Sequence, residues 1–178
     1  MSLRPDLVEC WVFRVAPPAS PGDARPEADR LEILLIRRAP DRIFPGLWQC
    51  VTGGIETGER VPHAAMREVR EETGLGDTDV LAWYDLDQVA PFYDEGGDAV
   101  VVSAIFAARA RPDAVVRASH EHDEIRWVPA RDAPSIAVWP SYAESVARIR
   151  DALLDPGRAR WFELDRDGRR IARHPAVG

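Results

Sequence analysis

The sequence predicts an α/β (α+β) fold in which helices cover the faces of a central mixed sheet. Segments rich in β-branched and aromatic residues outnumber the helical segments, and the two kinds are interleaved along the chain. The chain has 178 residues, of which 46% are hydrophobic and 30% charged, which is typical of a globular protein with a sizeable core. We therefore expect one domain over residues 1–155 and a C-terminal appendage over residues 156–178.

In the first third of the chain, β-forming residues predict three strands, at residues 7–15, 31–37 and 48–52. Two segments rich in turn-forming residues separate them. Residues 16–30 contain Pro17, Pro18, Pro21 and Pro26, which predicts an exposed loop. Residues 38–47 contain Pro40, Pro45 and Gly46 and are also expected to form a loop. The third strand leads directly into Gly53-Gly54.

The clearest helix is predicted over residues 61–73, because Pro62 suits its first turn and Gly74 its C-terminal end. A second helix is expected over residues 140–154, where apolar side chains recur every three or four residues. Further strands are expected at residues 80–86, 99–108 and 124–128. In the appendage, Asp167-Gly168 predicts the turn of a hairpin that joins residues 161–164 to 169–172.

The charge of the chain argues against several partners. It has 23 basic residues, all of them arginine, and 30 acidic residues, for a net charge of −7. An acidic chain binds long nucleic acids poorly, since neutralisation of phosphates dominates that affinity. The sequence shows neither a membrane-spanning apolar run nor a secretory signal, and Cys10 and Cys50 are too few for a disulfide framework. We expect a cytoplasmic protein with no membrane partner. The absence of lysine and asparagine, whose codons are rich in A and T, suggests a bacterial source with a GC-rich genome.

Three glutamates share one face of the first predicted helix. With about 100° per residue, Glu68, Glu71 and Glu72 fall within an arc of roughly 100°. Carboxylates at this spacing repel one another, so they belong either to a solvated face or to a site for a hard cation such as Mg²⁺. The helix alone leaves both readings open. The preceding segment favours the site, because Gly53, Gly54 and Gly58 permit a close backbone approach to a phosphate or a metal.

Residues 53–75 resemble the Nudix box at every fixed position and at the right spacing. The matching residues are Gly53, Glu59, Arg67, Glu68, Val69, Glu71, Glu72, Gly74 and Leu75. The resemblance implies the Nudix α/β/α sandwich, with a central mixed sheet, over roughly residues 7–154. It leaves residues 16–30 and 156–178 unexplained.

This resemblance implies a metal-dependent hydrolase that cleaves a pyrophosphate linkage in a nucleotide-like substrate. It implies Mg²⁺ as the cofactor, with Mn²⁺ able to substitute. Glu68, Glu71, Glu72 and the Gly53 carbonyl are the implied metal ligands. Arg67 is expected to hold a carboxylate through its planar guanidinium, with Glu59 as a partner. An ordinary surface ion pair between Arg67 and Glu59 is the alternative.

The segments that flank the box resemble those of bacterial dihydroneopterin triphosphate or dATP pyrophosphohydrolases, which release pyrophosphate. The resemblance rests on Arg37-Arg38, on Trp48-Gln49-Cys50-Val51-Thr52-Gly53, and on Glu121 shortly before Arg126-Trp127. It implies substrate contacts for Arg37, Thr52, Gly53 and Gly54, and a metal-binding role for Glu121. The chain lacks the lysine near the start of that branch's first strand, and Arg4 is the nearest replacement.

Other functions are compatible with the same fold. The Trp48-Gln49 segment also faintly resembles dinucleoside polyphosphate hydrolases and RNA 5′-end pyrophosphohydrolases. A Nudix domain that only binds nucleotides would usually lack box glutamates, and this chain retains them. Five aromatic residues are candidates either for base stacking or for the core: Trp48, Phe92, Tyr93, Trp139 and Tyr142.

The apolar side chains of the appendage also require a covering surface, since an isolated hairpin is only marginally stable. They are Trp161, Phe162, Leu164 and Ile171. Either they seal the monomer or they contribute to a homodimer, and the sequence leads us to expect the homodimer.

Overall fold

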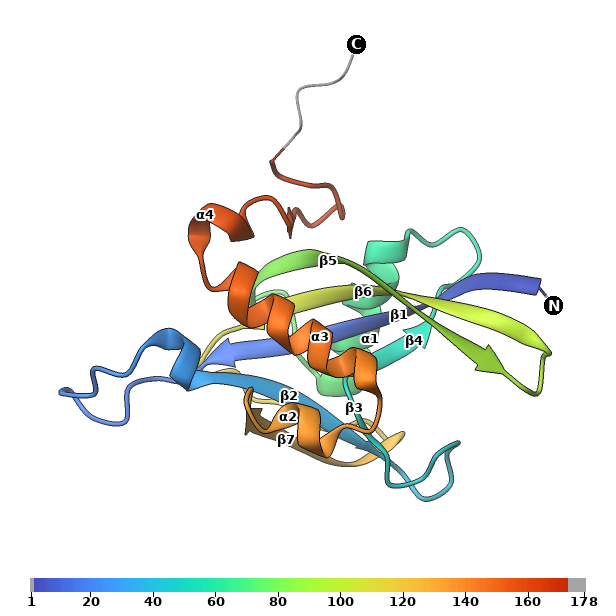
Figure 1. The fold of residues 1–178 in the computed structure, drawn as a ribbon, viewed down its shortest axis with the longest axis horizontal. Helices are drawn as coiled ribbons and strands as arrows, with labels where there is room; N and C mark the ends of the chain where they lie inside the picture. The colour runs from blue at the N-terminus through green and yellow to red at the C-terminus, as the bar shows by residue number, and fades with distance from the viewer. Residues whose placement is uncertain (1, 173–178) are drawn as a thin grey trace, which may run out of the picture.

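The computed structural model describes residues 2–172, which form one large mixed sheet with helices on both faces (Figure 1). The strands are β1 (Ser2–Val15), β2 (Leu31–Arg38), β3 (Trp48–Gln49), β4 (Val51–Gly54), β5 (Val80–Asp94), β6 (Ala99–Ala110), β7 (His122–Pro129) and β8 (Glu163–Leu164). Their order is β3-β2-β1-β6-β5-β8, while β4 also pairs with β1 and β7 with β2. Strands β1 and β6 are parallel and the other pairs are antiparallel, so the predicted mixed sheet is confirmed.

The two longer helices lie on opposite faces of this sheet, with α3 in front and α1 behind in Figure 1. The helical elements are η1 (Glu27–Arg30), α1 (Val61–Thr73), α2 (Ala133–Ile136), α3 (Pro140–Arg148), η2 (Ile149–Leu153) and α4 (Pro156–Ala159). This arrangement is the predicted α/β/α sandwich. Within residues 2–172, no helix is long and apolar enough to cross a membrane.

The alternating side chains of β1 divide the core into two layers. Trp11 and Phe13 point to the face covered by α3, where they pack with side chains that include Tyr142. Cys10 and Val12 point to the opposite face and pack with α1 through residues that include Val69. Both cysteines are buried and free, in agreement with the absence of a disulfide framework. The central position of β1 therefore holds both helices in fixed positions relative to the sheet.

Strand β5 continues eight residues beyond the predicted end at residue 86. A local turn forms just beyond residue 86, where the Asp87 N–H donates to Asp85 Oδ1 at 2.9 Å. Asp87 adopts a φ of 51°, and the register with β6 shifts between Asp85 and Gln88. The turn thus forms a β-bulge within the strand, and β5 continues beyond it. The helix predicted over residues 140–154 is present, but its last turn widens into the π-helix η2.

The C-terminal segment packs against its own chain. Strand β8 pairs with β5 through Trp83 and Leu164, and Leu164 also forms a bridge with Arg170. The Arg60 guanidinium donates to the Asp167 carbonyl at 2.6 Å, next to the start of α1. Phe162 and Leu164 are covered by the two core layers. Trp161 remains 48% exposed and Ile171 56%, so of the apolar side chains expected in the hairpin these two are available to a second subunit.

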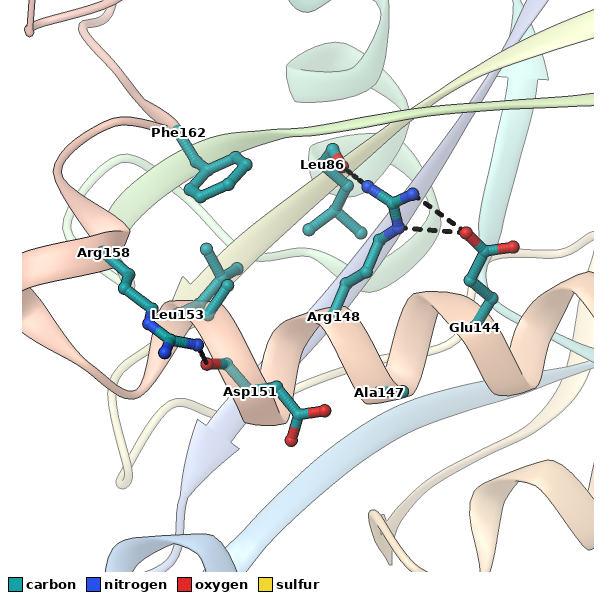
Figure 2. A pocket seen from close by; sticks show the side chains of 9 residues that line it. Leu86, Glu144, Ala147, Arg148, Asp151, Leu153, Arg158 and Phe162 are labelled. Carbon is teal, nitrogen blue, oxygen red and sulfur yellow. Dashed lines mark hydrogen bonds and ion pairs between the residues drawn. The ribbon is translucent and has the colours of Figure 1, made fainter.

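A cavity of about 350 Å³ lies between this segment and the α3–η2 helix. Figure 2 shows Phe162 and Leu153 on its apolar side and Arg148 on its polar side. Arg148 donates to Glu144 and to the Leu86 carbonyl, so its hydrogen-bonding groups are already engaged. The cavity is therefore a packing gap under the appendage and not a site with free polar groups.

The burial of Leu164 leads to a prediction about the appendage. Leu164→Ala should lower the free energy of unfolding by about 2–4 kcal/mol, since it leaves a cavity in the layer that contains α1. Ile171→Ala is the matched control, because Ile171 is 56% exposed, and it should change stability by less than about 0.5 kcal/mol. Denaturant unfolding of both variants measures this. Equal effects would show that β8 does not pack as described.

Candidate active site

Helix α1 presents its glutamates beside the end of β4. Its N-cap is Arg60, and it ends at Gly74, which has a φ of 72° and donates its N–H to the Arg70 carbonyl at 3.0 Å. This left-handed conformation favours glycine and terminates the helix. Val69 anchors the buried side of the helix, and Glu72 is also buried, with only 5% of its surface exposed. A charged residue is therefore held in the interface between the helix and the sheet.

Gly53 makes this approach possible. A Cβ atom at this position would lie 1.9 Å from Glu68 Cδ and 2.0 Å from its Oε1, so no other residue fits without displacing Glu68. No such conflict exists at Gly54, where a Cβ would meet nothing within 4 Å. The Glu68 carboxylate is thus pressed directly against the backbone of β4. This places the Gly53 peptide beside a carboxylate, as the resemblance implied.

Arg67 connects the carboxylates of the box. Its Nε and Nη2 donate to the two oxygens of Glu59, both at 3.0 Å. Its Nη1 donates to Glu68 at 2.7 Å and to Glu71 at 3.2 Å. Its Nη2 also donates to the Gly54 carbonyl at 2.8 Å. The predicted pairing of Arg67 with Glu59 is present, and it extends to a network that orients three glutamates and the glycine loop.

Burial changes the protonation of these groups. Burial, together with the nearby negative charges of Glu68 and Glu121, raises the pKa of Glu72 to about 8. Burial also raises the pKa of Glu68, even though Arg67 opposes this. By contrast, the hydrogen bonds from Arg67 lower the pKa of Glu59. Glu68, Glu72 and Glu121 therefore lie close enough for their charges to act on one another.

These three carboxylates fit the chemistry of a hard divalent cation, which prefers oxygen ligands and relieves their mutual repulsion. Glu68 and Glu72 lie at the sheet, and Glu121 comes from the segment before β7. Glu71 is the more exposed member of the box, at 58% of its side chain, and its carboxylate is engaged by Arg67. Within residues 2–172, no group of three or more histidine, cysteine, aspartate or glutamate side chains is placed so that it could hold a metal ion. Metal binding would therefore require these carboxylates to move closer together.

The residues expected to contact substrate have different surroundings. The Thr52 N–H donates to Glu72 at 3.3 Å, so Thr52 borders the glutamates directly. Arg37 instead forms ion pairs with Asp123 at 2.7 Å and with Glu124 at 2.9 Å. The arginine whose charge reaches Glu72 is the next one, Arg38, which lowers the pKa of Glu72.

The five aromatic residues named as candidates for base stacking also have different surroundings. Tyr142 belongs to the core and meets Trp11 edge to face, with ring centroids 4.8 Å apart. Trp48 lies under the guanidinium of Arg126, at 4.0 Å from the ring centroid. Phe92 and Tyr93 are exposed on β5. Trp139 is 43% exposed at the start of α3.

One buried acid near the site was not predicted from the sequence. Glu9 is only 7% exposed, and burial raises its pKa to about 7. Its Oε2 lies 3.9 Å from Cys50 Sγ, and Glu9 also influences the pKa of Tyr142. The signal was visible, since Glu9 interrupts the apolar alternation of β1 on the side that contains Trp11. A polar group therefore lies beneath α3, close behind Thr52, with which Glu9 is in register.

The sandwich and the glutamate-bearing helix that follows a glycine loop define the architecture of the Nudix hydrolase class. A model of the NUDIX domain matches residues 24–149, so the chain belongs to the Nudix family. A protein of Klebsiella pneumoniae named nucleoside triphosphatase NudI is 34% identical over 104 residues, which are 56% of this chain and 74% of that protein. An octanoyltransferase of Myxococcus xanthus is 37% identical over 129 residues, 69% of this chain, although the chain spans only 32% of that protein's length.

Solved structures share the fold. A Nudix hydrolase of Listeria monocytogenes is 25% identical with a TM-score of 0.63, and the match covers 85% of this chain and 95% of that one. The Escherichia coli dihydroneopterin triphosphate pyrophosphohydrolase is 21% identical with a TM-score of 0.56, covering 79% and 95% respectively. The Ap4A hydrolase of Caenorhabditis elegans is 22% identical with a TM-score of 0.57, covering 80% and 94%. These likenesses support the sandwich architecture.

The raised pKa of Glu72 leads to a prediction about stability. An acid whose pKa is raised on folding stabilises the protein below its unfolded pKa and loses that contribution as pH rises through the folded pKa, here from about 4.5 to about 8. Glu72→Gln cannot ionise and keeps an acceptor for the Thr52 N–H. Without metal, its stability relative to wild type should therefore increase between pH 5 and pH 8.5 by more than about 1 kcal/mol.

Denaturant unfolding in a chelating buffer at the two pH values measures this difference. Glu9 is present in both proteins, so its own titration cancels in the comparison. The same stability difference at both pH values would show that Glu72 is ionised throughout.

Proposed function

We propose that the chain hydrolyses a pyrophosphate linkage in a nucleoside triphosphate-like substrate, of the dATP or dihydroneopterin triphosphate type, and releases pyrophosphate. The observation that carries this proposal is the close contact of Glu68 with Gly53, together with the mutual electrostatic influence of Glu68, Glu72 and Glu121. The relative named nucleoside triphosphatase supports the substrate class. The proposed cofactor is Mg²⁺, for which Mn²⁺ can substitute.

The roles of the residues follow from their surroundings. Glu68, Glu72, Glu121 and the Gly53 carbonyl would hold the metal. When bound, a divalent cation neutralises phosphate charge and acidifies the attacking water. Glu59 stays ionised beside Arg67 and fixes that side chain, and Arg67 in turn orients Glu71 at the exposed end of the network. Because Glu72 has a raised pKa, its loss of a proton accompanies metal binding.

The test is release of pyrophosphate from a panel of nucleotides in the presence of Mg²⁺. The panel contains the nucleoside triphosphates, dihydroneopterin triphosphate, a dinucleoside tetraphosphate and a 5′-triphosphorylated RNA. Glu72→Gln should lower kcat on the best substrate by on the order of a hundredfold, which is ~3 kcal/mol in the barrier, with the fold retained. Turnover close to wild type in Glu72→Gln at saturating Mg²⁺ would refute the proposed site. Activity confined to the tetraphosphate or to the RNA would instead assign the substrate to that class.

Gly53 provides a second test that changes no charged group. Gly53→Ala should displace Glu68, because the new Cβ would overlap its carboxylate, and activity should fall by at least about tenfold. Gly54→Ala is the comparison, since its Cβ would point into open space, and it should lose far less. Initial rates of both variants over a series of Mg²⁺ concentrations measure this. A similar loss in both would show that the close approach to Glu68 is not what the site requires.

A further inference from the structure

The loop between β2 and β3, residues 39–47, lies beside the proposed metal ligands. The Ala39 N–H donates to the Glu121 carbonyl at 2.9 Å. The Gly46 N–H donates to the Arg38 carbonyl at 2.9 Å, and the Arg38 side chain donates to the Ile43 carbonyl. The same Arg38 carries the positive charge that acts on Glu72. The β2–β3 loop is therefore bonded to the backbone of Glu121 and to Arg38, whose charge acts on Glu72.

Arg42 in this loop has a guanidinium with unused donors. Its Nη2 lies 3.4 Å from Glu121 Oε1, whereas its Nε is 4.0 Å from Asp41 Oδ1, beyond hydrogen-bonding distance. Within the described chain this buried Nε has no hydrogen-bond partner. A buried donor without an acceptor costs about 1–3 kcal/mol, which a ligand oxygen would recover. The planar fork of arginine matches the oxygens of a phosphate.

Phe44, two residues further on, has an unusual backbone and an exposed ring. Its φ is 57°, in the left-handed region, and its side chain is 59% exposed. For a bulky residue this conformation costs of order 1–3 kcal/mol, and such strain is concentrated at functional sites. The ring meets Trp139 edge to face, with centroids 6.2 Å apart and an interplanar angle of 78°. Two aromatic side chains from separate elements thus form one exposed aromatic pair.

The spacing of these groups suits a nucleotide. Two residues apart, Arg42 and Phe44 have Cα atoms separated by no more than about 7 Å. One side chain turns towards Glu121 and the other towards the start of α3. A phosphate and a planar ring joined by a sugar present the same combination of an anion and an aromatic face at short range. Stacking on aromatic side chains accepts any base, because every base has a π face.

We propose that the β2–β3 loop contacts both ends of the substrate. Arg42 binds a phosphate oxygen, and Phe44, together with Trp139 at the start of α3, stacks on the planar heterocycle. This assignment rests on the proposed function, because it places the nucleotide at the same glutamates. Arg42 is then a substrate-binding residue that pairs with Glu121 until the phosphate arrives.

Binding experiments separate the two contacts. The ligands are the nucleoside triphosphate cleaved fastest in the panel, or dATP if none is cleaved, and inorganic tripolyphosphate as a probe without a base. Phe44→Leu and Trp139→Leu should each weaken nucleotide binding about tenfold and leave tripolyphosphate binding unchanged. Arg42→Gln should weaken both ligands by a similar factor. Calorimetry with Mg²⁺ in the Glu72→Gln background measures affinity without turnover.

Matched control variants and melting temperatures show whether a loss of affinity is caused by misfolding. Trp161→Leu removes a half-exposed tryptophan from the appendage, and Arg131→Gln removes an exposed arginine, and both should bind as wild type does. Phe44→Leu keeps a side chain at the strained position, so a normal melting temperature is expected. Unchanged nucleotide affinity in both aromatic variants overturns the proposal, and so does an equal loss of both ligands in Phe44→Leu.

The two proposals fail in different ways. A wild-type protein that binds nucleotides but releases no pyrophosphate refutes the proposed function, while the affinities of the loop variants still decide the role of the loop. Normal cleavage with unchanged KM in Arg42→Gln, Phe44→Leu and Trp139→Leu refutes the loop assignment alone.

Discussion

The constraint on which the site depends is the cost of holding several carboxylates together in a partly buried place. Glu68 and Glu72 lie between α1 and the sheet, and Glu121 acts on both of them. Burial and like charge oppose ionisation, so the arrangement is tolerated only where a proton or a cation compensates. Arg67 provides part of that compensation, and its hydrogen bonds to Glu59 keep it there. A divalent cation bound by these oxygen atoms would relieve the remaining repulsion and stabilise the fold.

The sheet gives this cluster its geometry. Strand β1 pairs with β4 through Val8 and Gly53, and the same strand anchors the core layers on both faces. The position of Gly53 relative to α1 is therefore set by a central strand that contributes to both core layers. The appendage adds a second support, because Arg60 and the Asp167 carbonyl connect it to the start of α1. The first part of the box, from Gly53 to the start of α1, is consequently fixed at two points, and precise placement of ligands requires such support.

The parts of the molecule that follow local rules were predictable from the sequence. Helix α1 has its predicted bounds, because Pro62 and Gly74 mark its ends, and the strands near residues 31–37 and 99–108 follow apolar composition. The β-bulge at Asp87 was not predicted, because the same residues also suit a turn, and only pairing with β6 decides between them. Arg42 and Phe44 were missed for a related reason. Their significance lies in an unpaired donor and a positive φ, and neither property can be read from residue identity.

The residues that were predicted and those that were missed lie in different parts of the chain, and we infer that they have different roles. The relative positions of the box residues depend on short-range geometry, since α1 is the next element after β4. The same arrangement of these residues can therefore serve different substrates. The β2–β3 loop is held at its start by the Glu121 carbonyl and further along by Arg38, whose carbonyl accepts from Gly46 and whose side chain donates to the Ile43 carbonyl. The strained Phe44 is held there by its ring contact with Trp139 and by the Leu47 N–H, which donates to its carbonyl at 3.2 Å. Under the proposed substrate contacts, this loop would add selectivity for the substrate to the proposed metal site of the box.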